Sequence, residues 1–232
     1  MQDLTLLFIT SNKMPEKWTE FHKKTLLEAA RDYPILTISR LPMDWGRNLL
    51  QTDTPSSKNF YKQILRGAKT ATTPYVALCE DDALYTADHF VYRPALDAFA
   101  YNINRWSLYT WGEPTYSFRA GDMCGCAGIY PRELVIEALE ERFAKYPDEI
   151  PIKVFGELGR YEKYLGVTER KVEQFYSSPP MIQVNHEFFS LTENNPETVA
   201  RRQKKRMGWL RATDIPYWGR ASDIVKYFYE SR

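Results

Sequence analysis

The chain has 232 residues, of which 44% are apolar, 15% are aromatic and 26% are charged, and its formal net charge is +1. This composition excludes an intrinsically disordered chain, and the length suits one α/β domain better than two very small ones. The sequence has no apolar run of the roughly 18 residues that a membrane span needs and no cleavable leader at its start, so we expect a soluble, cytoplasmic protein. The balanced charge excludes a nucleic-acid surface over the whole molecule but leaves room for a local basic patch.

The beginning of the chain predicts a strand, a helix and a second strand. Residues 4–9 form a continuous apolar run that stops at a polar triplet, as expected for a strand buried on both faces. Behind Pro15, apolar residues recur at helical spacing over 16–31, and residues 35–39 read as the second strand. A strand-helix-strand unit favours a parallel sheet.

A long loop, a helix and a strand follow. Residues 42–57 are rich in Pro, Gly, Asp, Ser and Thr and predict a loop that ends in the candidate helix caps Ser56 and Ser57. The helix predicted over 58–70 has one apolar face and a stripe of basic residues. The strand predicted over 75–79 runs directly into three acidic residues.

The rest of the chain alternates between strand and helix patterns. The predicted elements are a strand over 105–111, a glycine-spaced segment over 121–130 that leads into a helix at Pro131, a short helix over 157–165 that ends at Gly166, a strand over 181–185, a basic helix that begins near Asn195, and a final helix after Ser222. The three cysteines are an odd number, and we expect reduced thiols packed as small residues, with Cys124 and Cys126 side by side in a strand.

Polar groups follow three of the predicted strands. They are Thr10, Ser11 and Asn12 after 4–9, Glu80, Asp81 and Asp82 after 75–79, and His186 after 181–185. In an open parallel sheet the ligand site lies outside the carboxyl ends of the strands, so these groups are expected to converge. Three adjacent carboxylates repel one another unless a divalent cation or hydrogen bonds neutralise them, and a solvated turn is the plain alternative. An imidazole ligand favours Mn²⁺ among the hard cations, although a lone histidine is often only structural.

The segment PYVALCEDDALY (74–85), placed after a polar strand end and a basic helix, resembles the nucleotide-binding half of the GT-A type glycosyltransferases. Glu80 stands at the first acid of that family's Asp-X-Asp motif and Asp82 at the last. Similar segments are GCAGIYPREL (125–134), FGELGRYEKYL (155–165) and IQVNH (182–186), so the resemblance covers residues 4–190. It implies a GT-A-like, Rossmann-like three-layer α/β sandwich with a mostly parallel central sheet.

The resemblance also implies a donor site. Asp82 and His186 would hold Mn²⁺ or Mg²⁺, with Asp81 as a further ligand or behind the ligands, and the donor would be a nucleotide diphosphate sugar, with a UDP-sugar favoured. The residues expected against the donor's base, ribose and phosphates are Thr10, Ser11, Asn12, Glu80, Asp81 and Arg66, with Lys62 beside Arg66. Each has a plain alternative as a strand-end cap or a solvated helix face.

An inverting transfer needs a carboxylate that takes the proton of the acceptor hydroxyl. We expect Glu157 in this role because it leads the short helix in the family-like segment, with Glu162 and Asp122 as alternatives. A charge in the first turn of a helix is also common without any catalytic role. A retaining enzyme would need no such base.

The end of the chain contains the one dense basic run, RRQKKRMGWLR (201–211), followed by Trp218 and Arg220. The plain interpretation of this segment is a solvated helix face, and two functional hypotheses compete with it. In the first, the segment is a lid that brings Trp218 and Arg220 to the diphosphate. In the second, it binds DNA whose hydroxymethylated base is the acceptor, as in some phage-encoded transferases. We expect residues 1–190 to form the catalytic domain and 191–232 to form a helical, basic extension packed on it.

Two rival functions stay open. A nucleotidyltransferase shares the strand-to-carboxylate arrangement but usually has a glycine-rich, lysine-containing loop after its first strand, where this chain has only Thr-Ser-Asn-Lys. A nucleic-acid or carbohydrate binding module would carry the acidic triplet for structural reasons alone.

Overall fold

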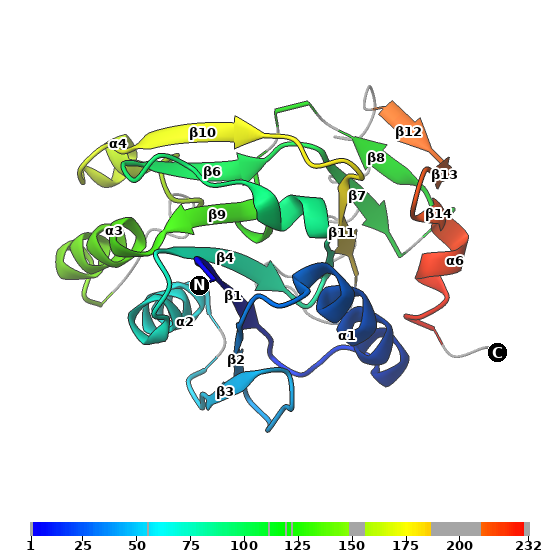
Figure 1. Ribbon diagram of the computed structural model, residues 1–232, viewed down its shortest axis with the longest axis horizontal. Coiled ribbons are helices and arrows are strands. Elements are labelled where there is room, and N and C mark those ends of the chain that lie inside the picture. Colours follow the sequence, from blue (N-terminus) through cyan, green and yellow to red (C-terminus); the bar gives the residue numbers. More distant parts are fainter. Residues whose placement is uncertain are drawn as a thin grey trace.

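A mostly parallel sheet forms the centre of the computed structural model, which describes residues 2–54, 56–110, 112–118, 120–121, 123–148, 156–186 and 210–229 (Figure 1). Its strand order is β10-β6-β9-β4-β1-β2-β3. The strands are β1 (Leu4–Ile9), β2 (Ile35–Ser39), β3 (Arg47–Leu50), β4 (Tyr75–Glu80), β6 (Ala98–Asn102), β9 (Gly128–Pro131) and β10 (Lys171–Phe175). Neighbouring strands are parallel except at β9, which runs antiparallel to β4 and β6. The predicted α/β class with a mostly parallel sheet is confirmed.

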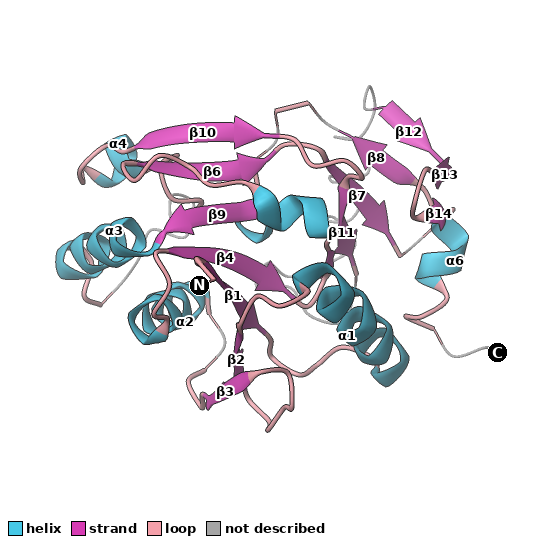
Figure 2. Ribbon diagram, in the orientation of Figure 1, coloured by secondary structure: helices cyan, strands magenta, loops and turns pink. Residues whose placement is uncertain are grey.

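Helices cover both faces of this sheet (Figure 2). They are α1 (Glu16–Ala30) with the 3-10 helix η1 (Ala87–Val91) on one face, and α2 (Ser57–Thr70) with α3 (Arg132–Lys145) on the other. Because side chains alternate along a strand, Leu6 and Phe8 of β1 pack with the α1 layer, whereas Leu7 and Ile9 pack with the α2 and α3 layer. The three layers follow directly from the unbroken apolar run of β1.

A second, five-stranded sheet stands at the carboxyl end of β4, in the order β12-β8-β7-β11-β5. Its strands are β5 (Ala83–Leu84), β7 (Arg105–Tyr109), β8 (Tyr116–Phe118), β11 (Met181–Asn185) and β12 (Leu210–Ala212). Only β7 and β11 pair in parallel; β5, β8 and β12 pair antiparallel with their neighbours. Since the 181–185 strand belongs here rather than to the central sheet, the polar strand ends meet across two sheets instead of along one edge.

Several predicted boundaries are wrong. The 42–57 loop contains β3, an edge strand that pairs in parallel with β2. The helix predicted over 157–165 is only α4 (Glu162–Leu165), although it ends at Gly166 in the left-handed conformation as expected. Strands β6 and β10 were not predicted. The cap prediction is confirmed at Ser56, whose Oγ accepts a hydrogen bond from the Asn59 amide at 3.0 Å.

The described end of the chain contains two short strands that were not predicted, and a final helix close to its predicted place. Beyond β12 lie the short strands β13 (Asp214–Ile215) and β14 (Gly219–Arg220) and the helix α6 (Ala221–Val225). Strand β12 pairs with β8, and α6 packs with β7 and β11 in one apolar cluster. The predicted basic helix falls within 187–209, outside the described residues. Among the described ranges, no helix has the length and apolar character to cross a membrane.

Candidate active site

The acidic turn is the link between the two sheets. Glu80 ends β4, Asp81 and Asp82 form the turn, and β5 begins at Ala83. Strand β5 pairs antiparallel with β11, and the Val184 amide donates to the Asp82 carbonyl oxygen. This pairing fixes where β11 ends and therefore brings the residue after it to the acidic turn.

Asp82 and His186 come together at that point. The His186 Nε2 atom lies 4.0 Å from Asp82 Oδ2, with the two side chains 5% and 22% exposed. Asp82 Oδ1 is buried and has no hydrogen-bond partner among the described residues. Burial lowers the pKa of His186 to about 4, so its imidazole is neutral at pH 7, and burial raises the pKa of Asp82 well above its usual value. A neutral imidazole facing an unsatisfied carboxyl group suits a cation better than it suits an ion pair.

Asp81 points to the end of β1 instead of to His186. Its Oδ2 accepts a hydrogen bond from Thr10 Oγ1 at 2.5 Å, and Thr10 Oγ1 accepts one from the Asn12 amide at 2.9 Å. Burial raises the pKa of Asp81 to about 6, partly offset by Thr10 and by the backbone of Ser11. The expected convergence of the first strand end with the acidic turn therefore occurs, through Asp81.

Glu80 takes a third direction, toward the loop before β9. Its Oε1 lies 3.7 Å from the position that a Cβ on Gly125 would occupy. The Glu80 amide donates to Tyr85 Oη, which donates to the Cys126 carbonyl oxygen. Burial, followed by the charge of Asp82, raises the pKa of Glu80 well above its usual value. The three carboxyl groups thus diverge, each toward a different part of the chain.

Helix α1 also supports the turn, which the sequence did not indicate. Trp18 Nε1 donates to the Asp81 carbonyl oxygen at 2.7 Å, and His22 Nε2 lies 2.8 Å from the Ala83 carbonyl oxygen. Trp18 also stacks on Phe228, and Phe228 stacks on His186, with ring centroids 4.2 and 5.8 Å apart. Helical spacing marked Trp18 only as a core residue, because a side chain's hydrogen-bond partner leaves no trace in periodicity.

A cavity of about 390 Å³ lies next to the turn. Thr10, Asn12 and Asp81 line it together with the rings of Phe8, Trp18 and Trp45. The Asn12 side chain is already engaged, since its Oδ1 accepts from the amides of Arg40 and Leu41 at 2.8 and 3.0 Å. Asn12 therefore shapes the cavity by holding the loop after β2, and its predicted contact with the donor stays a prediction.

Arg105 of β7, which the sequence analysis did not indicate, lies close enough to Asp82 for its charge to act on that carboxyl group. Arg105 is buried, donates to Gln183 Oε1 at 2.6 Å, and its charge lowers the pKa of Asp82. Arg66 is exposed and donates to the Leu50 carbonyl oxygen at the end of edge strand β3. The sequence showed a basic stripe on a helix, but it gave no sign that a single arginine at the start of a strand would lie near the carboxyl groups.

The predicted lid residue Trp218 is held against the segment before β11, and the lid itself stays a prediction. Trp218 Nε1 donates to the Pro180 carbonyl oxygen at 2.7 Å, and Arg220 is an exposed residue of β14 at the start of α6. Trp218 and the exposed Tyr217 line a groove of about 590 Å³ between α1 and the end of the chain. Two further predicted features lie outside the described residues: Asp122 and most of the basic run, 201–209.

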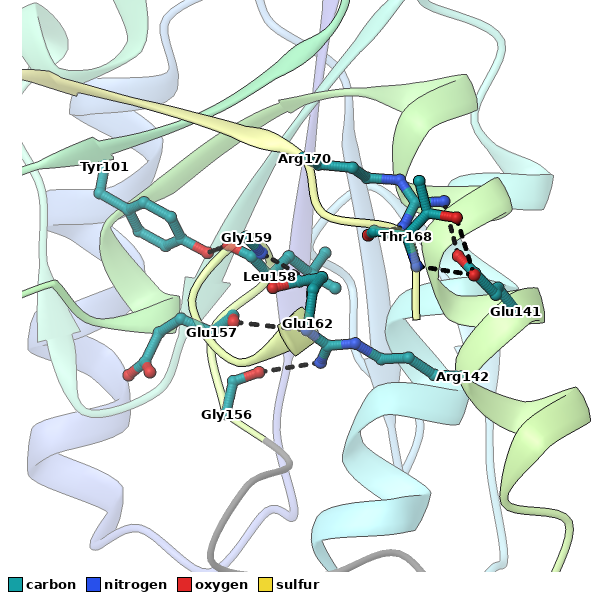
Figure 3. A network of polar contacts seen from close by, with 10 residues as sticks. All are labelled: Tyr101, Glu141, Arg142, Gly156, Glu157, Leu158, Gly159, Glu162, Thr168 and Arg170. Atoms are coloured by element: carbon teal, nitrogen blue, oxygen red, sulfur yellow. Dashed lines mark hydrogen bonds and ion pairs between the residues drawn. The ribbon is translucent and has the colours of Figure 1, made fainter. Parts of the chain in front are cut away.

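Glu157 lies in a turn before α4, so the expectation that it leads a helix is wrong. A buried ion pair holds this turn: Arg142 Nη2 of α3 lies 2.6 Å from Glu162 Oε1. Arg142 also donates to the carbonyl oxygens of Gly156 and Glu157, at 3.0 and 3.5 Å. The Glu157 side chain points away from this pair (Figure 3) and contacts Arg160 at 3.3 Å. Its charge adds to the effects that raise the pKa of Glu80, so the Glu157 carboxylate lies near enough to act on Glu80.

The donor set suits a hard cation held by few protein ligands. No group of three His, Cys, Asp or Glu side chains in metal-binding geometry occurs in the described ranges. Mg²⁺ and similar ions usually bind one or two protein groups and complete their shell with water and substrate phosphates. The unsatisfied Asp82 Oδ1 and the neutral His186 fit this requirement.

Comparisons with known proteins find resemblance of structure and none of sequence. No protein-family model and no curated protein matches the chain. A mannosyltransferase from Pyrobaculum calidifontis, solved with GDP-Man and Mn²⁺, is 12% identical with a TM-score of 0.47, over 88% of this chain and 61% of that one, so this chain spans less than two thirds of its length. A 2-C-methyl-D-erythritol 4-phosphate cytidylyltransferase from Thermus thermophilus is 12% identical with a TM-score of 0.43, over 88% of this chain and 100% of that one. S. aureus TarS is 10% identical with a TM-score of 0.43, over 79% of this chain and 37% of that one. These similarities are distant and assign no residue, donor or acceptor to this chain.

Proposed function

We propose that this chain is a metal-dependent glycosyltransferase that moves a sugar from a nucleotide diphosphate sugar, with a UDP-sugar favoured, to an acceptor hydroxyl. The observation that carries the proposal is the approach of His186 Nε2 to Asp82 Oδ2, which are 4.0 Å apart. The other carboxylate oxygen of Asp82, Oδ1, is buried and has no hydrogen-bond partner among the described residues. Asp82 and His186 would hold Mn²⁺ or Mg²⁺, which supplies positive charge to the departing diphosphate. Arg105 adds a buried positive charge to the same cluster.

The nucleoside part of the donor fits the cavity beside Asp81. Its volume of about 390 Å³ and its aromatic wall are typical of small-molecule sites. Thr10 holds the Asp81 carboxylate at the border of this cavity and the acidic turn. The cavity and the proposed cation site are thus adjacent, as a ligand with a base at one end and a diphosphate at the other requires.

The experiment is Mn²⁺ binding in the presence of UDP, measured by equilibrium dialysis on the full chain. We expect Asp82→Asn and His186→Ala each to weaken Mn²⁺ binding by more than about tenfold, because each removes one of only two protein ligands. Asp97→Asn is the matched control, since Asp97 forms an exposed ion pair with Lys171 at the far edge of the sheet. Unchanged Mn²⁺ binding in both site variants would contradict the proposal.

Product analysis separates the proposed activity from its rivals. With nucleotide sugars and Mn²⁺, a glycosyltransferase releases a nucleoside diphosphate. A nucleotidyltransferase instead releases pyrophosphate from a nucleoside triphosphate, and a binding module releases neither.

For the acceptor we propose to test DNA with a hydroxymethylated base, on the strength of the basic run 201–206 in the sequence. Replacing its five Lys and Arg residues with Gln should weaken DNA binding and reduce the dependence of affinity on salt, because fewer counterions are released. Fluorescence anisotropy at several salt concentrations measures both quantities. Equal DNA affinity and equal salt dependence in the variant and the wild type would exclude DNA binding by residues 201–206.

A further inference from the structure

The loop before β9 brings two thiols into contact. Cys124 and Cys126 lie on either side of Gly125, where the 3-10 turn η2 (Gly125–Ala127) begins. Their sulfur atoms are 3.3 Å apart, with the Cys126 thiol donating to Cys124. The sequence predicted two thiols side by side in a strand; the turn instead folds one sulfur onto the other. The third cysteine, Cys79, is buried in β4.

The two thiols have unequal surroundings. Cys126 is fully buried, whereas Cys124 is partly exposed. Cys124 Sγ lies 3.6 Å from Gln183 Oε1, which also accepts from Arg105. The hydrogen bond from Cys126 and the charge of Arg105 lower the pKa of Cys124 to about 7, while the same contact and burial raise the pKa of Cys126. The accessible sulfur is therefore the better nucleophile, and the buried one is placed to react after it.

The alternative uses of this pair fit the structure less well. A structural zinc site needs about four ligands, and the described residues offer no third His, Cys, Asp or Glu in metal-binding geometry around the two sulfurs. Simple packing accounts for Cys79 but not for two polar sulfurs that contact each other and an amide oxygen. The sugar transfer proposed above uses neither thiol.

We propose that Cys124 and Cys126 form an oxidisable dithiol that hydroperoxides convert into an intramolecular disulfide. The Cys124 thiolate attacks one oxygen of hydrogen peroxide, the O–O bond breaks, and a sulfenic acid forms. The departing hydroxide takes up the proton that Cys124 released on ionising and leaves as water. The Cys126 thiol then attacks the sulfenic sulfur, the S–O bond breaks, and a second water leaves as the S–S bond forms. The thiol pair loses two electrons and the peroxide gains them. The sulfurs must approach from 3.3 Å to about 2 Å.

A disulfide between Cys124 and Cys126 would lie next to Glu80. Glu80 Oε1 lies against Gly125 between the two cysteines, and Tyr85 links the Cys126 carbonyl oxygen to the Glu80 amide. The disulfide would therefore form in the wall of the acidic cluster.

The test uses the reduced full chain, treated with an equimolar amount of hydrogen peroxide, then unfolded, alkylated with N-ethylmaleimide and digested with trypsin. Both cysteines fall in the single tryptic peptide 120–132, whereas Cys79 falls in another. We expect peptide 120–132 to be unlabelled and lighter by two hydrogen atoms, with Cys79 still labelled and both labels restored by a phosphine reductant. Labelling of both Cys124 and Cys126 after oxidation would overturn the proposal, as would a bridge to Cys79 or to a second chain.

Two controls separate the native geometry from the mere presence of two neighbouring thiols. Oxidation in urea should form the bridge more slowly than in the folded protein, because unfolding removes the contact with Arg105 and the alignment of the sulfurs; a faster reaction in urea would contradict a built site. In Cys126→Ser, dimedone should trap Cys124 as a sulfenic acid, whereas in Cys124→Ser the buried Cys126 should stay reduced at the same dose. The wild-type peptide measurement remains decisive if either variant fails to fold.

Discussion

At the scale of single residues, a buried neutral histidine makes the fold sensitive to acid. His89, a residue of η1, is fully buried, with its Nδ1 3.0 Å from Asn102 Nδ2, and burial lowers its pKa to about 3. In the unfolded chain a histidine titrates near about 6.5. Between these values the unfolded state binds a proton that the folded state does not. The stability from this group is therefore fully present above about pH 6.5 and decreases as the pH falls toward 3.

Replacing His89 with Gln removes this proton while keeping an acceptor for Asn102. Between pH 7 and pH 5, we expect the free energy of unfolding of the wild type to fall by about 2 kcal/mol more than that of His89→Gln. Urea unfolding of both proteins at pH 7 and pH 5 measures this change in the free energy of unfolding. The difference between the proteins is the quantity to compare, because the raised pKa of Asp81 acts in the opposite direction in both. Parallel pH dependences would show that His89 is protonated in the folded state.

At the scale of elements, the ion pair between α3 and α4 holds the turn that contains Glu157, the residue that the sequence analysis predicts as the base. Arg142 and Glu162 are 0% and 2% exposed, and the Arg142 guanidinium also holds the backbone of the turn that contains Glu157. We expect Glu162→Gln to lower the free energy of unfolding by about 3 kcal/mol, because it leaves a buried charge without its partner. Removing that charge as well, in Arg142→Met with Glu162→Gln, should recover part of the loss.

The same pair distinguishes a positioning residue from a base. Glu157→Gln should abolish sugar transfer and leave Mn²⁺ and UDP binding unchanged, because the proposed role of Glu157 is only to accept the acceptor's proton. Glu162→Gln should lower the rate of transfer less, and the pH profile of its remaining activity should match that of the wild type. Full transfer activity in Glu157→Gln would exclude it as the base, while a shifted pH profile in Glu162→Gln would point to Glu162 itself.

The elements also show what the sequence could reveal. The continuous apolar run 4–9 and the shorter strand patterns 35–39 and 181–185 predicted β1, β2 and β11 with their observed bounds. Helical spacing after Pro15 and Ser56 predicted α1 and α2. Strand β10 was missed because its residues, KVEQF, are mostly charged or polar, as an edge strand allows. The approach of His186 to the acidic turn was predictable from strand ends, but Arg105 and Trp18 act through partners far along the chain, which no local pattern encodes.

At the scale of the whole molecule, residues 227–229 pack against helix α1 and against His186 at the candidate active site. Tyr227 stacks on Phe21 of α1, Phe228 lies between Trp18 and His186, and Tyr229 Oη donates to the Thr110 carbonyl oxygen at 2.8 Å. One short segment thus joins the helix that supports the acidic turn to the strand that carries the imidazole. The central sheet, the second sheet and the end of the chain meet at His186.

Removing the ring of Phe228 tests this closure. Phe228 is 3% exposed, and Phe228→Ala should lower the free energy of unfolding by about 3 to 5 kcal/mol through the cavity it leaves. It should also weaken Mn²⁺ binding in the presence of UDP, because His186 loses the ring that fixes its orientation. Tyr229→Phe is the matched control: it loses one hydrogen bond, costs about 1 kcal/mol and should leave Mn²⁺ binding unchanged. Phe228→Leu should restore most of the stability that Phe228→Ala loses, but it cannot restore the ring stack on His186. If Mn²⁺ binding also recovers in Phe228→Leu, Phe228 contributes only packing and does not orient His186.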